Sequence, residues 1–182
     1  NNVALGLSAG KYVKSDKNIL IGAEAASAEK TIGTENIVIG YQSGKLMGIT
    51  VSGAGPTSNI FMGANAGNNS QGDNNIYIGK NSGTQNSSGS GNVYLGYNTS
   101  INTTNGENGV IIGYEAGKNV SNVNSTVLVG YQSGFNLGGT TNTCVGFKSC
   151  LVGTNNNTTL GYQSAMNACL LYTSDAADDS QC

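Results

Sequence analysis

A short pattern of apolar, small and polar positions recurs along the whole chain. Its clearest copy is residues 36–44, with the sequence Asn-Ile-Val-Ile-Gly-Tyr-Gln-Ser-Gly. The copies align on one glycine each, and successive glycines lie 15 to 23 residues apart. These glycines are Gly6, Gly22, Gly40, Gly63, Gly79, Gly96, Gly113, Gly130, Gly146 and Gly161. A short, loosely held period is typical of a solenoid, in which each coil buries its apolar face against its neighbours.

The three residues before each glycine form a predicted strand. Aliphatic residues stand three and one positions before it, as in Ile37 and Ile39, and this spacing of two indicates one buried face. The position between them points the other way, yet it too is apolar in most copies. Because a lone solenoid would present a polar residue to water there, we expect this middle column to contact a second chain. The predicted interface residues are Leu20, Val38, Phe61, Tyr77, Tyr94, Ile111 and Leu128.

Asparagine stands four residues before the glycine in eight of the ten copies. These residues are Asn2, Asn18, Asn36, Asn59, Asn75, Asn92, Asn142 and Asn157. Asparagine tolerates left-handed backbone and bonds its own backbone in turns. Identical amides on successive coils can also hydrogen-bond to one another. The column therefore predicts a ladder of stacked amides.

After the glycine come, in most copies, an aromatic residue, a polar residue, a small residue and a second glycine. We interpret this run as a second short strand, pinched where the small column points inward, with the second glycine supplying positive φ at a turn. The predicted fold is all-β: a parallel β-solenoid, or β-roll, of about ten short coils over residues 1–166. We interpret this range as a fragment of a longer fibre.

The pattern N-Φ-x-Φ-G-x-x-[AS]-[GA] resembles the head repeat of trimeric autotransporter adhesins. The sequence Gly-Tyr-Gln-Ser-Gly at residues 40–44 and 130–134 resembles even more closely the repeats in phage and bacterial tail-fibre-like proteins. This resemblance implies left-handed coils, a homotrimer and an extracellular place on a virion or a cell surface. It also implies a structural and adhesive role with a host-surface glycan or receptor as partner, although a shared fold does not transfer a receptor.

One aromatic column runs through consecutive copies and is the candidate ligand contact. It consists of Tyr97, Tyr114, Tyr131, Phe147 and Tyr162. The column is either a stacking platform for sugar rings or an aromatic ladder that rigidifies the roll or lines a contact between chains. We favour the ladder.

The composition excludes several kinds of chemistry. The chain has no histidine and only 10% charged residues, so it lacks a histidine-based triad or zinc site. We predict no enzyme, no catalytic residue, no metal and no cofactor. No arginine is present, which argues against nucleic-acid binding, and no apolar run predicts membrane insertion of this fragment. A self-assembling extracellular filament is the alternative, with a polysaccharide-active enzyme on a β-helix ranked below it.

Two segments interrupt the repeat. Residues 45–58 form the longest insertion and carry Leu46, Met47, Ile49 and Val51, which we expect to pack on the roll or on a neighbour. The insertion is the best candidate for a specificity loop, although a packing role is favoured. Residues 167–182 break the pattern and look like translated read-through of a sequencing-library adaptor, so we expect this tail to be non-native.

Two smaller features leave alternatives open. Lys11, Lys14 and Lys17 follow the first copy, and a solvated loop is favoured over contact with phosphates or acidic glycans. Cys144 and Cys150 lie in one copy, in columns expected to point in different directions. Free thiols and a disulfide both remain open for this pair, and no metal motif accompanies it.

Overall fold

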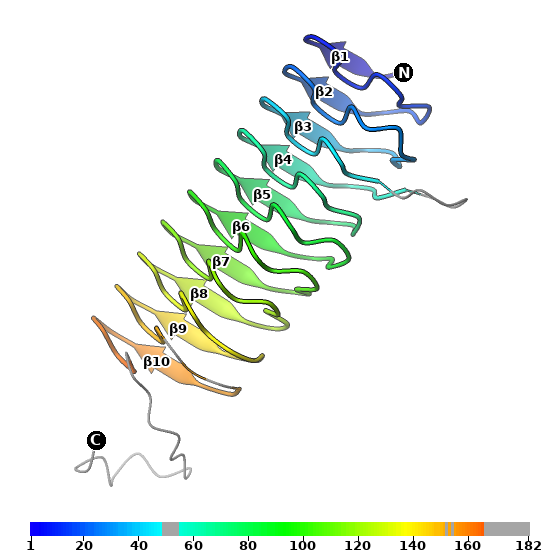
Figure 1. Cartoon of the computed structure of the whole chain (residues 1–182). Coiled ribbons are helices and arrows are strands. Elements are labelled where there is room, and N and C mark those ends of the chain that lie inside the picture. Colours follow the sequence, from blue (N-terminus) through cyan, green and yellow to red (C-terminus); the bar gives the residue numbers. More distant parts are fainter. Residues whose placement is uncertain (49–54, 152, 154, 166–182) are drawn as a thin grey trace, which may run out of the picture.

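The computed structural model is a single stack of coils and describes residues 1–48, 55–151, 153 and 155–165. Its strands are β1 (Val3–Leu5), β2 (Ile19–Ile21), β3 (Ile37–Ile39), β4 (Ile60–Met62), β5 (Ile76–Ile78), β6 (Val93–Leu95), β7 (Val110–Ile112), β8 (Val127–Val129), β9 (Thr143–Val145) and β10 (Thr158–Leu160). They form one parallel sheet in sequence order (Figure 1). At about 4.8 Å between neighbouring strands, the nine intervals give a rod of roughly 43 Å. The predicted parallel β-solenoid of ten short coils is confirmed.

Here a coil is numbered by the strand that opens it and runs to the residue before the next strand. The strands pair in one fixed register, so residues at equal distance from the aligned glycine stack on one another. Val38 pairs with Phe61, for example, and Phe61 with Tyr77. The predicted boundary at residue 166 and the predicted non-native tail lie outside the described residues, as do Ile49 and Val51 of the insertion. Met47 packs in the core, as expected, whereas Leu46 is exposed.

The two faces of the strand are reversed from the sequence-based prediction. The middle column points into the coil and forms the core of a single chain. Leu20, Val38, Phe61, Tyr77, Tyr94, Ile111 and Leu128 are each 0–1% exposed. Their prediction as a subunit interface is therefore wrong, because no second chain can reach them. The flanking aliphatics, predicted to be buried, point outward instead and are half-exposed along most of the sheet.

The far side of each coil is built from turns, so the predicted second strand is absent from the described residues. The backbone turns because the polar column two residues after the glycine has left-handed φ, as in Gln42 at 54° and Asn81 at 59°. The second glycine has positive φ as predicted, for example Gly67 at 55°. It also makes room for the core, since a Cβ at Gly67 would lie 2.6 Å from the Phe61 ring.

The predicted asparagine ladder is confirmed. The side-chain oxygen of Asn18 accepts from both the backbone and the side-chain nitrogen of Asn36, at 3.0 and 3.1 Å. Asn36 holds Asn59 in the same way, at 3.1 Å for both bonds. These amides are buried, so each bond also satisfies polar groups that would otherwise be costly to take out of water. The ladder fixes the stacking of one coil on the next.

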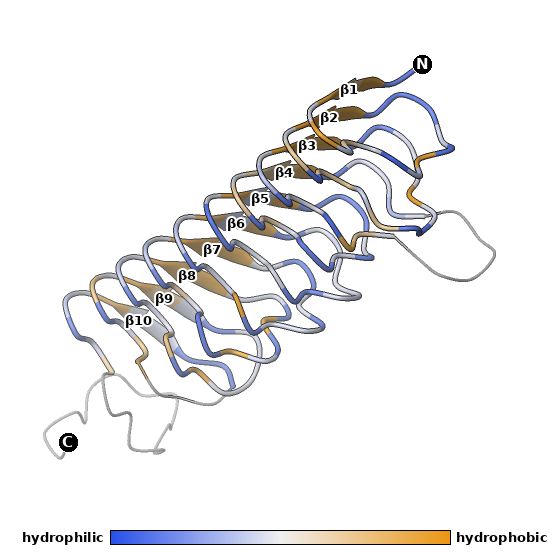
Figure 2. Ribbon diagram, turned by 45° about the horizontal axis from the view of Figure 1, so that its top comes forward, coloured by the Kyte–Doolittle hydropathy of each residue, from blue (hydrophilic) through white to orange (hydrophobic). Residues whose placement is uncertain are grey.

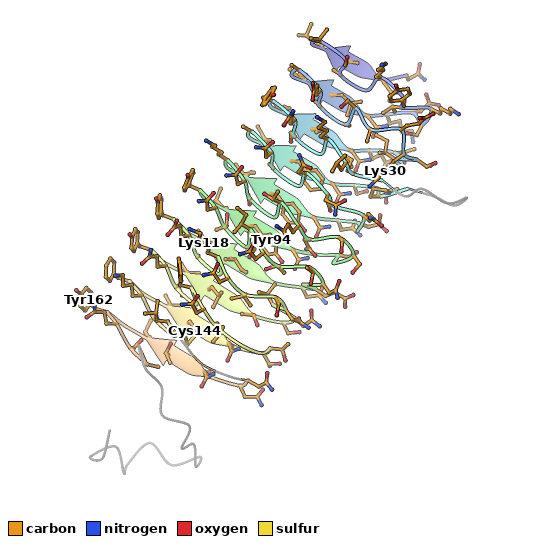
Figure 3. All side chains as sticks on the ribbon, in the orientation of Figure 1. Lys30, Tyr94, Lys118, Cys144 and Tyr162 are labelled. Carbon is orange, nitrogen blue, oxygen red and sulfur yellow. A yellow bond between two sulfur atoms is a disulfide. The ribbon has the colours of Figure 1, made fainter. Side chains whose placement is uncertain are left out.

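The centre of the core is a stack of aromatic rings. Tyr77 lies between Phe61 and Tyr94, with ring centroids 5.0 and 4.8 Å away, and Figure 3 shows Tyr94 among the coils. Asn86 donates a hydrogen bond of 2.7 Å to the Tyr77 hydroxyl. The hydroxyls of Tyr94 and its neighbour Ser100 have no hydrogen-bond partner in the described part of the chain. Burial raises the pKa of both phenols well above the usual value of 10.

This difference predicts opposite effects for two matched substitutions. Tyr77→Phe should lower the free energy of unfolding by about 1 kcal/mol, because it removes a hydrogen bond and leaves the Asn86 amide poorly satisfied. Tyr94→Phe should leave the stability unchanged or raise it, because it removes a buried hydroxyl that bonds nothing. Urea denaturation followed by circular dichroism compares the two. A larger loss for Tyr94→Phe than for Tyr77→Phe would contradict the assignment.

Cys144 and Cys150 form a disulfide across the interior of coil 9, with their Cα atoms 5.9 Å apart. The expectation that their columns point in different directions is wrong. Cys144 occupies the inward middle column, and Cys150 occupies the position that holds glycine in most coils. The same two positions face each other in other coils, as Phe61 and Gly67 do in coil 4. The bridge therefore replaces a side-chain contact that the other coils make without a covalent bond.

Reduction of this disulfide should lower the free energy of unfolding by about 2 kcal/mol, because closing a short loop restricts the unfolded chain. Thermal denaturation with and without a thiol reductant measures the effect. The matched control is the double variant Cys144→Val with Cys150→Gly, which gives coil 9 the pair that coil 3 has in Val38 and Gly44. Its stability should not respond to reductant; an equal response in both proteins would show that the bridge is not the cause.

Candidate binding surfaces

The outward face of the sheet is an apolar surface, which we call the apolar face. It consists of the side chains one and three positions before the aligned glycine, and both are apolar in every strand from β1 to β8. Met62 and Leu95 are 38% and 42% exposed on it, and most other members are half-exposed. Figure 2 shows the hydrophobic colour concentrated along the strands, with hydrophilic colour in the connecting segments. The apolar face is continuous because the strands stack in register.

Continuous exposed apolar surfaces are unusual on monomeric proteins, and large ones commonly mark interaction sites. The residues of the apolar face lie on strands, and each strand is held in place by its two neighbours. They therefore cannot turn inward to hide their side chains from water. The sequence-based prediction placed the core and the contact surface on the wrong columns; a second chain covering one strand face stays a prediction, now for the apolar face. The apolar face is thus the candidate subunit contact.

The candidate ligand column forms an exposed ladder at one corner of the coils. Tyr97, Tyr114, Tyr131, Phe147 and Tyr162 stack with successive ring centroids 5.1 to 5.3 Å apart. Each is at least 38% exposed, and Tyr162 reaches 72%. Figure 3 shows Tyr162 at the outer corner of the last described coil. The structure therefore brings together all five residues that the sequence singled out.

Stacking decides between the two interpretations of this ladder. A sugar ring packs its C–H face on the face of an aromatic ring, but the faces of Tyr114, Tyr131 and Phe147 are covered by their neighbours on both sides. Only ring edges, hydroxyls and the outermost faces meet solvent. The geometry favours the structural ladder, in which each stacked pair adds to the rigidity of the rod.

Charged side chains pair at this corner both within a coil and between coils. Lys118 contacts Glu115 at 2.6 Å, and Gln132 of the next coil donates to the same carboxylate at 2.9 Å. The hydrogen bond from Lys118, followed by that from Gln132, lowers the pKa of Glu115. Lys45 and Gln42 lower the pKa of Glu24 in the same way. These groups stabilise the corner but present no pair of carboxyl groups with separate acid and base roles.

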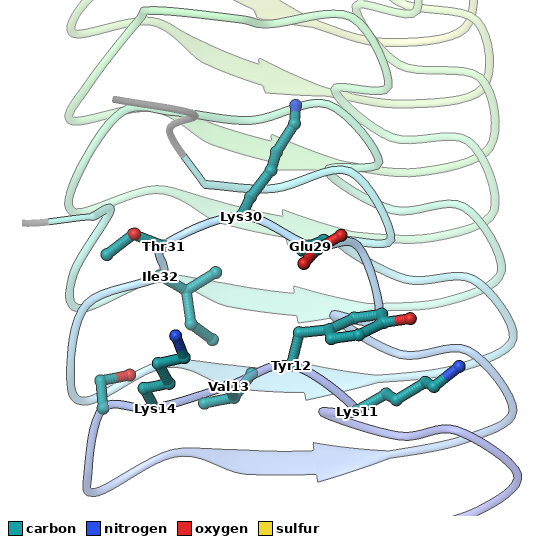
Figure 4. Close-up of a pocket in the computed structure, with 9 residues that line it drawn as sticks. Lys11, Tyr12, Val13, Lys14, Glu29, Lys30, Thr31 and Ile32 are labelled. Carbon is teal, nitrogen blue, oxygen red and sulfur yellow. The ribbon is translucent and has the colours of Figure 1, made fainter. Parts of the chain in front are cut away.

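A pocket of about 520 Å³ lies between the connecting segments of coils 1 and 2. It is lined by Lys11, Tyr12, Val13, Lys14, Ser15, Glu29, Lys30, Thr31 and Ile32. Figure 4 shows Tyr12 and Lys14 on the coil 1 side, and Glu29 and Ile32 on the coil 2 side. The sequence-based interpretation of Lys11 and Lys14 as part of a solvated loop missed this pocket. A signal was present: position seven after the glycine, which holds Met47, Val120 or Leu137 in other coils, is Glu29 in coil 2.

Within the described ranges, no three histidine, cysteine or acidic side chains gather closely enough to hold a metal ion. The same part of the chain contains no helix that is long and apolar enough to cross a membrane. No protein-family model, curated protein or solved structure matches the chain.

Proposed function

We propose that the chain is a structural and adhesive, non-catalytic segment of a trimeric extracellular fibre, on a phage tail or on a cell surface. The observation that carries this proposal is the apolar face. A rigid rod with one flat apolar side is suited to association along its length with copies of itself, because every copy offers the same face in the same register. Such an assembly would cover the aliphatic residues that a single chain leaves half-exposed.

Burial of this face would stabilise the rod substantially. Each aliphatic side chain that passes from exposed to buried contributes about 1.5–3 kcal/mol at full burial, and the columns already start half-buried. The apolar face alone does not set the number of chains, since a face-to-face pair would also cover one face per chain. The number three comes from the resemblance of the repeat to adhesin heads. Three sheets around one axis would bury the aliphatic columns and leave the aromatic corner and the connecting segments outside.

The disulfide of coil 9 supports the extracellular assignment. Disulfides form and persist in oxidising compartments and are rare in reducing ones. This bridge lies in the core, with Cys144 and Cys150 each at most 1% exposed. The fibre role and the bridge therefore point to the same surroundings.

Sedimentation velocity over a hundredfold range of chain concentration tests the proposal. A single species of three times the chain mass of 18.5 kDa, independent of concentration, is the expected result. A mass that rises steadily with concentration would favour the self-assembling filament instead. A monomer at every concentration would contradict both, and turnover of any polysaccharide in a panel would contradict the non-catalytic role.

A further inference from the structure

The stacking of the coils is interrupted at the pocket between coils 1 and 2. Elsewhere backbone hydrogen bonds join the connecting segments, as from Leu46 to Asn68 at 2.7 Å and from Ser87 to Thr104 at 3.0 Å. In the described structure no backbone hydrogen bond joins residues 11–15 to residues 27–32. The two segments meet again only where the Ser15 hydroxyl donates to the Gly33 carbonyl at 2.7 Å. The pocket is a local opening of the stack rather than a groove common to all coils.

The pocket has an apolar floor and one aromatic wall. Ile32 is buried in the core cluster, and Val13 packs against that cluster. The Tyr12 ring is 39% exposed, and the Lys11 ammonium lies 4.9 Å from its centroid. Lys11 covers one face of Tyr12, but no aromatic ring stacks on the other face in the described structure, unlike the faces within the ladder. Figure 4 shows Glu29 on the opposite side of this ring from Lys11.

The rim of the pocket carries three lysines and one glutamate. The Lys30 ammonium donates to the Leu46 carbonyl at 2.8 Å, and Figure 4 shows it pointing away from the pocket. The side chains of Lys14 and Glu29 form no ion pair or hydrogen bond with any described residue. The pocket thus combines unpaired positive charge, one free carboxylate, the hydroxyls of Ser15 and Thr31, and an aromatic ring.

The geometry points to a binding site for an acidic pyranose, a sugar ring that carries a carboxylate. The C–H face of such a ring would pack on the Tyr12 face turned away from Lys11, its carboxylate would approach Lys14, and Glu29 would accept hydrogen bonds from its hydroxyls. The volume lies within the usual range for small-ligand sites, which combine an apolar lining with a few polar groups. The site is formed within one chain, so it does not depend on the proposed trimer.

Isothermal titration calorimetry with three probes tests this site: glucuronate, glucose and inorganic phosphate. Glucuronate should bind saturably, and glucose should bind about tenfold more weakly or not at all. Salt should weaken glucuronate binding, because the charged groups are exposed. Equal binding of glucose and glucuronate, or equal binding of phosphate, would overturn the assignment to an acidic sugar. Absence of binding by glucuronate would overturn the site itself.

Matched variants locate the site. Tyr12→Ala should weaken glucuronate binding about fivefold or more, and Lys14→Gln by up to about fivefold. The controls are Tyr41→Ala and Lys80→Gln, which alter an exposed tyrosine and an exposed lysine in other coils and should leave the affinity unchanged. If Tyr12→Ala unfolds, Tyr12→Phe, which should keep most of the affinity, and Lys14→Gln carry the test. Equal losses in the control variants would overturn the proposal.

Discussion

Replacing Gly63 by alanine is expected to lower the free energy of unfolding by about 3 kcal/mol or more. Gly63 has φ of +135°, a conformation open to glycine and strained for other residues. A Cβ at this position would also lie 2.6 Å from the carbonyl oxygen of Gly79 and 2.7 Å from its carbonyl carbon. These are backbone atoms of the next coil, and the Gly79 amide donates a hydrogen bond of 2.8 Å to the Met62 carbonyl oxygen. The next coil cannot move away without breaking the ladder.

Gly161→Ala is the matched control for this substitution. Gly161 occupies the same column with φ of +129°, but no described atom lies within 4 Å of a Cβ placed there. It should therefore lose only the cost of backbone strain, about 1–3 kcal/mol. Urea denaturation of both variants separates strain from the clash between coils. Equal losses would mean that the close approach of successive coils does not explain the glycine column.

Two neighbouring isoleucines in β7 should differ greatly in their response to the same substitution. Ile111 is 0% exposed in the core, so Ile111→Lys would bury an unpaired charge and create a packing defect. We expect a loss of about 4 kcal/mol or more in the free energy of unfolding. Ile112 lies on the apolar face and is half-exposed. Ile112→Lys should change the stability of a single chain by less than about 1 kcal/mol, since the lysine can reach water.

Circular dichroism and thermal denaturation at low protein concentration measure these two effects without a contribution from association. A Val110→Lys variant provides a second outward substitution in the same strand and should behave as Ile112→Lys does. A loss of fold in Ile112→Lys together with an intact fold in Ile111→Lys would restore the original assignment of the two faces and contradict the structure.

The repeat made the strands and their register predictable, because aliphatic residues and the aligned glycine mark the same positions in every copy. Alternation alone did not predict which side of the strand faces the core. All three strand positions are apolar, and a pattern of period two does not say which face is inside. The residue types that face each other within a coil do show which side of the strand is inside. Phe61 and Tyr77 are followed six residues later by glycine, and Cys144 is followed six residues later by Cys150, which fits only if these positions face each other.

The aromatic ladder and the pocket differ in the same respect. The ladder was predictable because Tyr97 and its successors share one column of a regular repeat. The pocket depends on two connecting segments that diverge from each other, and on Ile32 rather than residue 29 filling the core in coil 2. A periodic pattern does not describe such a departure, so the charged residues around Tyr12 could be interpreted only as a solvated loop.

Sedimentation equilibrium of the unmodified chain beside Ile112→Lys tests most directly whether the outward aliphatic columns join the subunits. The account predicts a discrete trimer for the unmodified chain and a folded monomer, with an unchanged circular dichroism spectrum, for the variant. An unmodified chain that stays monomeric, or a variant that remains trimeric, would contradict it.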